Sequence, residues 1–246
     1  ARNIETLLVA IAGIEAARLL ELDRICKPMG INVRIIPTTS EIVGGAVRLG
    51  DISDVTEEDL MGRRPIQTDE HQITSFIMGR RVLVTGAGGS IGSELVRQLM
   101  RYNPQELYLL DRDESALHAV QLSLDGTGTL MSDSLILADL RDAQRIDEVL
   151  ASTKPEIVFH AAALKHLPLL ERFPGEALKT NVIGTRDLLA ASVSHGVEVF
   201  INISTDKAAD PSSVLGTSKL ITERLTAGAG RLISGKYASV RFGNVL

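Results

Sequence analysis

Short apolar runs alternate with amphipathic helical stretches along most of the chain. Each run is short enough to be a strand buried on both faces rather than a helix. Six of these runs are predicted as strands, at residues 82–85, 107–110, 135–138, 157–160, 197–203 and 238–242. Because strands that alternate with helices form parallel sheets covered on both faces, the pattern predicts an α/β fold with a doubly wound parallel sheet of the Rossmann type.

A smaller β-α-β pattern precedes this region. Residues 6–12 are predicted as a buried strand, 15–27 as an amphipathic helix and 31–36 as a second strand. One such unit cannot cover both of its faces, so we expect it to pack on the remainder or to be the tail of a domain that begins upstream. Residues 51–69 are acidic and turn-rich, with Gly62 and Pro65, and are predicted as a connector. A boundary near 78–80 then separates a partial β-α-β unit and linker at 1–79 from a Rossmann domain at 80–246.

Composition and charge exclude several classes of function. The 246 residues are 44% hydrophobic with a net charge of -5 and no basic stripe, which argues against nucleic acid as a partner. No apolar run approaches the roughly 20 residues that span a bilayer, so no membrane contact is expected from this segment. Cys26 is the single cysteine, which excludes a disulfide within the chain and favours a cytoplasmic setting. No spacing of histidines or carboxylates suggests a metal site.

The first strand of the larger domain leads into a glycine-rich loop, Val84-Thr85-Gly86-Ala87-Gly88-Gly89-Ser90-Ile91-Gly92. Gly86 is expected to permit the tight turn, Gly89 to let backbone amides approach a pyrophosphate, and Gly92 to bring the helix close to the strand. Ser90 and Ile91 open that helix, whose N-terminus would face the negative charge. The loop therefore predicts a site for a nicotinamide dinucleotide, with a glycine turn that binds nothing as the alternative.

Acidic residues follow the next two strands. Asp111 ends the second strand, where a carboxylate can accept hydrogen bonds from the adenosine ribose and repel a 2′-phosphate, which favours NAD over NADP. Arg112 could accommodate that phosphate, so NADP stays an alternative. Asp139, after the third strand, could reach the adenine edge or instead cap the following helix.

The glycine spacing TGxxGxxG occurs together with Ala138-Asp139-Leu140-Arg141-Asp142. This combination resembles the extended short-chain dehydrogenase/reductase superfamily. Four further motifs resemble the nucleotide-sugar 4,6-dehydratases of polysaccharide biosynthesis, over nearly all of residues 80–246; they are HAAALKH at 160–166, NVIGT at 181–185, ISTDKA at 203–208 and RFGNVL at 241–246. Residues 1–79 resemble part of the linker domain in the large, membrane-anchored branch of that family.

The resemblance implies a lyase that recycles its cofactor. NAD takes a hydride from carbon 4 of a UDP-hexose, expected to be UDP-N-acetylglucosamine, water leaves across carbons 5 and 6, and the hydride returns to carbon 6. Oxidation at carbon 4 makes the proton on carbon 5 acidic, so an acid–base pair must lie beside the nicotinamide. By resemblance, Lys207 is the base at carbon 5, Asp206 the acid that protonates the departing hydroxyl, and Thr205 the partner of the oxygen on carbon 4. A solvated Asp206–Lys207 ion pair is the alternative.

Further cofactor contacts are implied around the fourth strand and the last helix. Lys219 matches the superfamily lysine that contacts the nicotinamide ribose. Leu215, one helical turn earlier, stands where the superfamily normally has tyrosine, although the large branch tolerates an apolar residue, usually methionine. Leucine cannot exchange a proton, so Asp206 or a bound water is the expected replacement base. The remaining implied contacts come from Leu140, Ala161, Ala162 and Lys165, of which Lys165 could equally be a surface residue.

Two other functions stay open. A nucleotide-sugar 4-epimerase would use the same fold and cofactor without needing Asp206 and Lys207, and a catalytically impaired module would bind NAD without turnover. The resemblance also implies a smaller sugar-binding lobe beyond Leu246, missing from this chain, and anchoring of a longer parent through an upstream segment. A homo-oligomer is a further open alternative.

Overall fold

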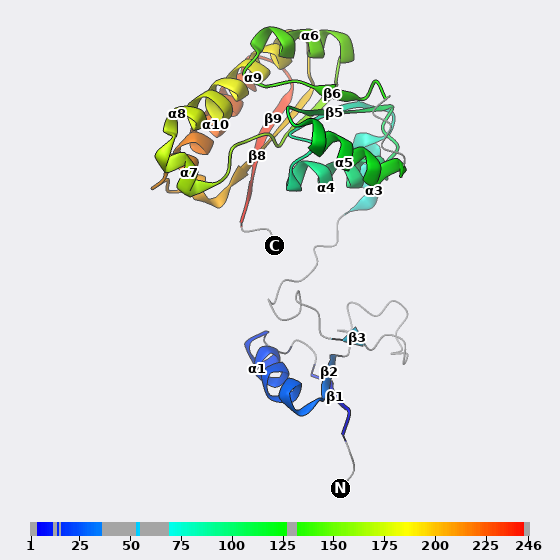
Figure 1. Cartoon of the computed structure of the whole chain (residues 1–246). Coiled ribbons are helices and arrows are strands. Elements are labelled where there is room, and N and C mark those ends of the chain that lie inside the picture. The colour runs from blue at the N-terminus through cyan, green and yellow to red at the C-terminus, as the bar shows by residue number, and fades with distance from the viewer. Residues whose placement is uncertain are drawn as a thin grey trace. The chain divides into compact units, whose positions relative to one another are not determined.

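The computed structural model describes residues 4–11, 14, 16–35, 53–54, 69–126 and 132–243. They belong to two compact units, residues 1–68 and residues 69–246 (Figure 1). Of the connector predicted at 51–69, residues 51–52 and 55–68, with Gly62 and Pro65, lie outside the described residues, whereas 53–54 form a short strand. The terminal residues 1–3 and 244–246 also lie outside the described residues.

The first unit has a β-α-β order. It contains β1 (Thr6–Val9), α1 (Ala16–Cys26), a 3-10 turn η1 (Lys27–Met29), β2 (Asn32–Ile35) and β3 (Ser53–Asp54). β1 and β2 are parallel and β3 is antiparallel to β2, while α1 contributes to a small core made by Val9, Leu19, Cys26 and Val33. The predicted order is confirmed, but the expectation of a buried first strand is wrong. Val9 is buried whereas its neighbour Leu8 is 44% exposed, because successive side chains of a strand point to opposite faces.

The second unit is built on a six-stranded parallel sheet with the order β6-β5-β4-β7-β8-β9. Its strands are β4 (Arg81–Thr85), β5 (Glu106–Asp111), β6 (Leu135–Leu137), β7 (Ile157–His160), β8 (Val199–Thr205) and β9 (Lys236–Phe242). All six predicted strands are confirmed; the largest shift is in β8, predicted at 197–203. Because the chain order reverses between β4 and β7, the switch point where such sheets bind ligands lies at the carboxyl ends of these two strands.

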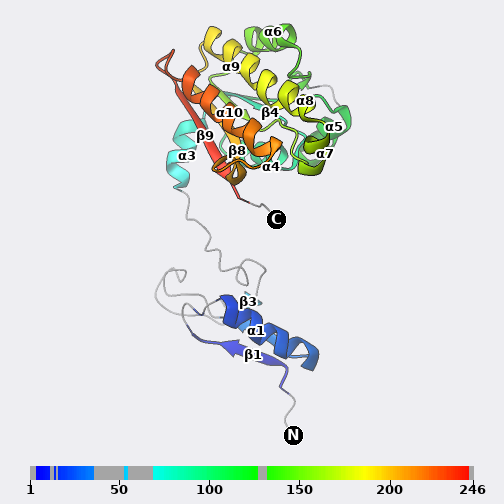
Figure 2. The same cartoon turned by 90° about the vertical axis from the view of Figure 1, so that its left-hand side faces the viewer.

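Helices cover both faces of this sheet (Figures 1 and 2). Val82 and Val84 point to one face, where they pack with α3 (Glu70–Ile77), α4 (Ser90–Met100) and α5 (Glu114–Asp125). Leu83 points to the opposite face, where the core includes residues of α6 (Ala143–Thr153), α9 (Gly184–Ser194) and α10 (Val214–Ala229). The result is the α/β doubly wound architecture that the apolar pattern predicted.

The second unit begins earlier than the boundary expected near residues 78–80. Asp69 caps α3 by accepting a hydrogen bond from the Gln72 amide at 3.1 Å, and Ile77 at the other end of the helix is 1% exposed in the core. A short capped helix therefore anchors the start of this unit. The sequence pattern assigned that stretch to the linker because eight residues show too little periodicity to be recognised.

Short elements follow the strands at the edge where the switch point lies. α7 (Leu167–Arg172), α8 (Pro174–Ala177) and a π-helical turn η3 (Leu178–Ile183) follow β7, and a 3-10 turn η4 (Asp206–Ala208) follows β8. Within the ranges that the structure describes, no helix is long and apolar enough to cross a membrane.

Candidate cofactor cavity and acid–base site

Gly86 follows β4 and lies close to the backbone of the loop after β7. Its φ is +69°, and a Cβ placed there would lie 2.5 Å from the backbone nitrogen of Ala162 and 2.6 Å from its Cα. Ala161 N–H donates to the carbonyl of Thr85 at 3.0 Å, which continues the pairing of β4 and β7 into their loops. Any side chain at Gly86 would be strained and would separate these loops.

Helix α4 starts directly on this loop. Its N-cap is Gly89, which offers no side chain to accept from the first amides of the helix. A Cβ at Gly92 would overlap the carbonyl oxygen of Gly86, so the helix can approach the loop only through a glycine. The uncapped amides make the N-terminus of α4 an anion-binding position.

A cavity of about 270 Å³ lies beside the loop, at the carboxyl ends of β4, β5, β6 and β7. It is lined by eight of the residues expected to contact a cofactor, namely Gly86, Gly89, Asp111, Arg112, Asp139, Leu140, Ala161 and Ala162. Ser90, Ile91 and Gly92 form the first turn of α4 beside it, and the Lys165 ammonium donates to Ser90 Oγ at 3.1 Å. Four strand ends that are distant in sequence thus share one recess.

Asp111 is held rigidly in the cavity wall. Its Oδ2 accepts a hydrogen bond from the Gly88 amide at 2.9 Å and its Oδ1 accepts one from the Asp113 amide at 3.1 Å. A Cβ at Gly88 would overlap Ala116 Cβ and lie 3.1 Å from Asp111 Oδ2. Gly88 therefore lets the loop reach Asp111, a role that the three-residue spacing of the other glycines did not indicate.

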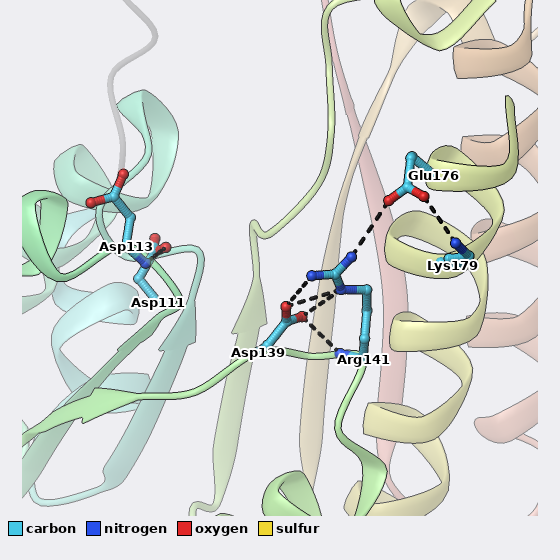
Figure 3. A network of polar contacts seen from close by, with 6 residues as sticks. All are labelled: Asp111, Asp113, Asp139, Arg141, Glu176 and Lys179. Carbon is cyan, nitrogen blue, oxygen red and sulfur yellow. Dashed lines mark hydrogen bonds and ion pairs between the residues drawn. The ribbon is translucent and has the colours of Figure 1, made fainter. Parts of the chain in front are cut away.

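Asp139 is fixed by an arginine two positions along the chain (Figure 3). Its carboxylate accepts from the Arg141 amide at 3.0 Å and from the guanidinium, with a shortest distance of 2.6 Å. These hydrogen bonds hold the pKa of Asp139 below its usual value. The cap of α6 is Asp142, which accepts from the Arg145 amide at 3.0 Å, so the alternative in which Asp139 caps this helix is wrong.

Thr180 was not foreseen as a site residue. It lies in η3, lines the cavity and is 7% exposed, yet its hydroxyl has no hydrogen-bond partner among the described residues. A buried hydroxyl without a partner costs about 1–3 kcal/mol, so a polar ligand group in the cavity would relieve this cost. No local pattern in the sequence indicates this role, because Thr180 reaches the cavity wall only through the tertiary packing of the π-helical turn η3.

These features fit a dinucleotide. The cavity combines uncapped amides for a pyrophosphate, a fixed carboxylate for a ribose, apolar walls and an orphaned hydroxyl. Across the described ranges, no group of three or more histidine, cysteine or acidic side chains could hold a metal ion.

His160 ends β7, directly before the cavity residue Ala161, and joins three elements. Its ring nitrogens are 2.7 Å from Thr85 Oγ1 and 2.8 Å from Thr185 Oγ1. Complete burial, together with the charge of Lys219, lowers the pKa of His160 to about 3, so the ring is neutral at physiological pH. It ties β4 to β7 and α9.

The expected acid–base block lies outside this cavity, at the end of the next strand. Thr205 ends β8 and donates to Asp206 Oδ1 at 2.9 Å, while the Lys207 ammonium is 3.4 Å from the same oxygen. The hydrogen bond from Thr205, followed by the contact with Lys207, lowers the pKa of Asp206. The side chains of Asp206 and Lys207 are 58% and 41% exposed.

Lys219 is buried in α10 behind this block. Its ammonium donates to the carbonyl of Ile203 at 2.8 Å. Burial lowers the pKa of Lys219 to about 8, and the nearby Glu223 opposes this shift. Leu215, one turn earlier, is buried in an apolar cluster with Leu170 and Ala177.

Glu223 forms an unforeseen network that supports the end of β8. Its carboxylate accepts from Ser204 Oγ at 2.6 Å and from two nitrogens of Arg241 at 2.8 and 2.7 Å. Ser204 and Arg241 face each other across the β8–β9 pair. The network links α10 with β8 and β9 directly beside Thr205. It is made by residues distant in sequence, so no local pattern indicates it.

A sequence profile described as "Polysaccharide biosynthesis protein" matches residues 82–246. The chain is 38% identical over 245 residues to the probable polysaccharide biosynthesis protein EpsC of Bacillus subtilis, covering 99% of this chain and 41% of that protein. It is 44% identical over 178 residues to an uncharacterized membrane protein of Methanocaldococcus jannaschii, covering 71% and 51%. It is 33% identical over 172 residues to a UDP-N-acetylglucosamine 4,6-dehydratase (inverting) of Campylobacter jejuni, covering 68% and 50%. The chain therefore spans about half, or less, of these relatives.

Solved structures agree with the fold. The UDP-glucose 4-epimerase of Thermotoga maritima, solved with UDP-glucose, superposes with a TM-score of 0.57 at 26% identity, covering 67% of this chain and 56% of that one. The resemblance drawn from the motifs is confirmed by the sequence profile and by these relatives.

Proposed function

Because this chain belongs to the polysaccharide biosynthesis protein family, we propose that residues 80–246 hold NAD and form the cofactor half of a nucleotide-sugar 4,6-dehydratase. UDP-N-acetylglucosamine is the proposed substrate, in line with the name of the Campylobacter relative. The observation that carries the proposal is the Thr205-Asp206-Lys207 block at the carboxyl end of β8, next to the β7 end that borders the cavity. Parallel doubly wound sheets bind their ligands along this edge. The name of the archaeal relative supports the further expectation of a membrane-anchored parent.

In this proposal, the cofactor is held by backbone and carboxylate groups. The first amides of α4 bind the pyrophosphate, the fixed carboxylate of Asp111 accepts from the adenosine ribose, and Asp139 accepts from the adenine edge. NAD is preferred over NADP because a 2′-phosphate would meet the anionic Asp111. Arg112 in the same wall is the group that would weaken this preference.

When bound, NAD would accept a hydride from carbon 4 of the sugar and later return it to carbon 6. Asp206 is proposed to accept the proton of the carbon 4 hydroxyl, because it lies beside Thr205 and Lys207 at the end of β8. It can then deliver this proton to the hydroxyl that leaves carbon 6 as water. Lys207, acting in its neutral amine form, takes the proton from carbon 5 and returns it when carbon 6 is reduced, while Thr205 donates to the oxygen on carbon 4. In this reaction scheme Asp206 takes the role of the superfamily tyrosine, because Leu215 stands at the position where that tyrosine normally lies.

Lys219 is proposed to act on the ribose next to the nicotinamide. An ammonium group has three donors, and the carbonyl of Ile203 takes one of them at 2.8 Å. Glu223, one helical turn further along α10, stabilises the buried positive charge. This charge also favours an ionised hydroxyl nearby.

One observation favours a second candidate, an NAD-binding module without turnover. Leu215 is 6% exposed and packs with Leu170 and Ala177, so no proton-transfer group replaces tyrosine at that point of α10. A 4-epimerase is a third candidate, named by the Thermotoga structure.

The decisive experiment is to incubate the intact protein with UDP-N-acetylglucosamine and follow the product by mass spectrometry. Loss of one water, with formation of a 4-keto-6-deoxy sugar, is the expected result. A product of unchanged mass but altered configuration would replace the dehydratase with an epimerase. Calorimetric binding of NAD without conversion of any UDP-hexose would support the inactive module.

A further inference from the structure

Arg141 lies immediately behind the cavity wall. It follows β6 and is not itself among the described residues that line the cavity, whereas its partner Asp139 is. The guanidinium donates to both carboxylate oxygens of Asp139, with Nε at 3.1 and 2.9 Å and a terminal nitrogen at 2.6 Å. A planar fork of this kind fixes the orientation of a carboxylate, which a single ammonium group cannot do.

The same arginine reaches a second element. Its other terminal nitrogen is 3.4 Å from Glu176 in α8, and Glu176 also pairs with Lys179 at 2.9 Å. Figure 3 shows the guanidinium between the two carboxylates, with Asp111 at the end of β5 and Asp113 just beyond it. Arg141 is therefore held from both sides, by the loop after β6 and by the helix after β7.

This arrangement determines what Asp139 can recognise. The hydrogen bonds from Arg141 keep the carboxylate anionic, and an anionic carboxylate accepts hydrogen bonds but cannot donate them. Adenine presents an exocyclic amino group, which donates. Hypoxanthine presents a carbonyl oxygen at the same position, which an oriented carboxylate would repel.

We propose that Arg141 and Glu176 form a positioning clamp that makes the cavity select adenine as the base of its cofactor. The clamp acts through Asp139 and does not touch the ligand itself. This inference rests on the proposed binding of NAD in the cavity and adds how the base is chosen.

The test compares NAD with nicotinamide hypoxanthine dinucleotide, which differs only at the base, by calorimetric titration of the full chain. Wild type is expected to prefer NAD. Arg141→Ala should bind NAD about tenfold more weakly, the loss that corresponds to one weakened charge-assisted hydrogen bond, and should bind the hypoxanthine analogue unchanged. The preference for adenine would then largely disappear.

Two further variants make the result specific. Arg145→Ala removes a nearby exposed arginine whose side chain pairs with Glu148 on its own helix, and it should leave both affinities unchanged. Glu176→Gln keeps Asp139 and Arg141 intact and should reduce the preference by a smaller factor, with circular dichroism confirming that each variant is folded.

If Arg141→Ala and Arg145→Ala showed the same preference for NAD over the hypoxanthine analogue, while wild type still bound NAD, the clamp would be overturned. The proposed function would then still stand. Failure of wild type to bind NAD would overturn both.

Discussion

The proposed cofactor cavity and the Thr205-Asp206-Lys207 block lie on the same edge of one sheet but are built differently. The cavity is shaped by backbone: Gly86 lies against Ala162, and Asp111 is held by two amides. The block consists of side chains that contact one another at the end of β8, with Asp206 and Lys207 58% and 41% exposed. The proposed binding site is thus preorganised by the fold, whereas the side chains proposed for chemistry are exposed.

This difference separates stability from activity. An exposed ion pair contributes about 0–1 kcal/mol to stability, so the block can be altered without unfolding the protein. Close backbone contacts in a packed interior leave no room for added atoms, so the cavity cannot be altered in the same way. Four variants, in order of expected effect, test this contrast.

Lys207→Ala should give the largest effect and should touch activity alone. Loss of a general base lowers the dehydration rate by about 10²–10⁴-fold, while NAD affinity and unfolding free energy stay at wild-type values. Mass spectrometry of the product measures the dehydration rate, and calorimetry measures the NAD affinity. The matched control is Lys236→Ala, because Lys236 starts β9 at the sheet edge opposite to the block. An unchanged rate in Lys207→Ala would favour an epimerase.

Gly86→Ala should damage the cavity and the fold together. A left-handed φ and a Cβ 2.5 Å from Ala162 N add strain and overlap, with an expected loss of about 3 kcal/mol in unfolding free energy. Gly126→Ala has a similar φ of +72° but no atom within 4 Å, so it should lose only about 1–2 kcal/mol. Equal losses in urea denaturation would show that the close approach contributes nothing.

His160 should make the cavity region sensitive to acid. Its pKa is about 3 in the folded chain and about 6.5 when unfolded, so the unfolded state binds more protons between these values. Stability is fully present above pH 6.5 and falls as the pH drops, by about 2 kcal/mol at pH 5. His160→Gln should remove this part of the slope in urea denaturation at pH 7 and pH 5. His195→Gln, a partly exposed histidine paired with Asp147, should retain it.

Asp111→Asn should have the smallest effect, on cofactor choice. The amide is neutral, so NAD should bind about tenfold more weakly and the relative affinity for NADP should rise. Titration with both cofactors measures this, with the exposed Asp133→Asn as control. An unchanged ratio of the two affinities would point to Arg112 as the group that sets it.

The six strands and the glycine loop could be predicted because their signals are local. Apolar runs such as residues 157–160 match their strand without any shift, and Gly86 has the positive φ that its turn position implied. Asp111 could be found because it ends a strand, and the ends of parallel strands converge at one edge of a sheet. The start of the second unit was less predictable, since α3 has too few residues to show a clear period.

Other features depend on contacts between distant residues and leave no such signal. Gly88 is needed because Ala116 and Asp111 approach it, and Thr180 is buried because a π-helical turn packs it against the cavity. Glu223 meets Ser204 and Arg241 only once α10 lies on β8 and β9.

The order of elements, the glycine loop and the family motifs follow from the sequence alone, because periodicity, glycine spacing and strand-end acids are short-range properties. The orientation of Asp139, the orphaned hydroxyl of Thr180 and the burial of Lys219 come from the packed structure. They depend on which helix covers which strand end, and burial then sets both the hydrogen-bond partners and the pKa of each group.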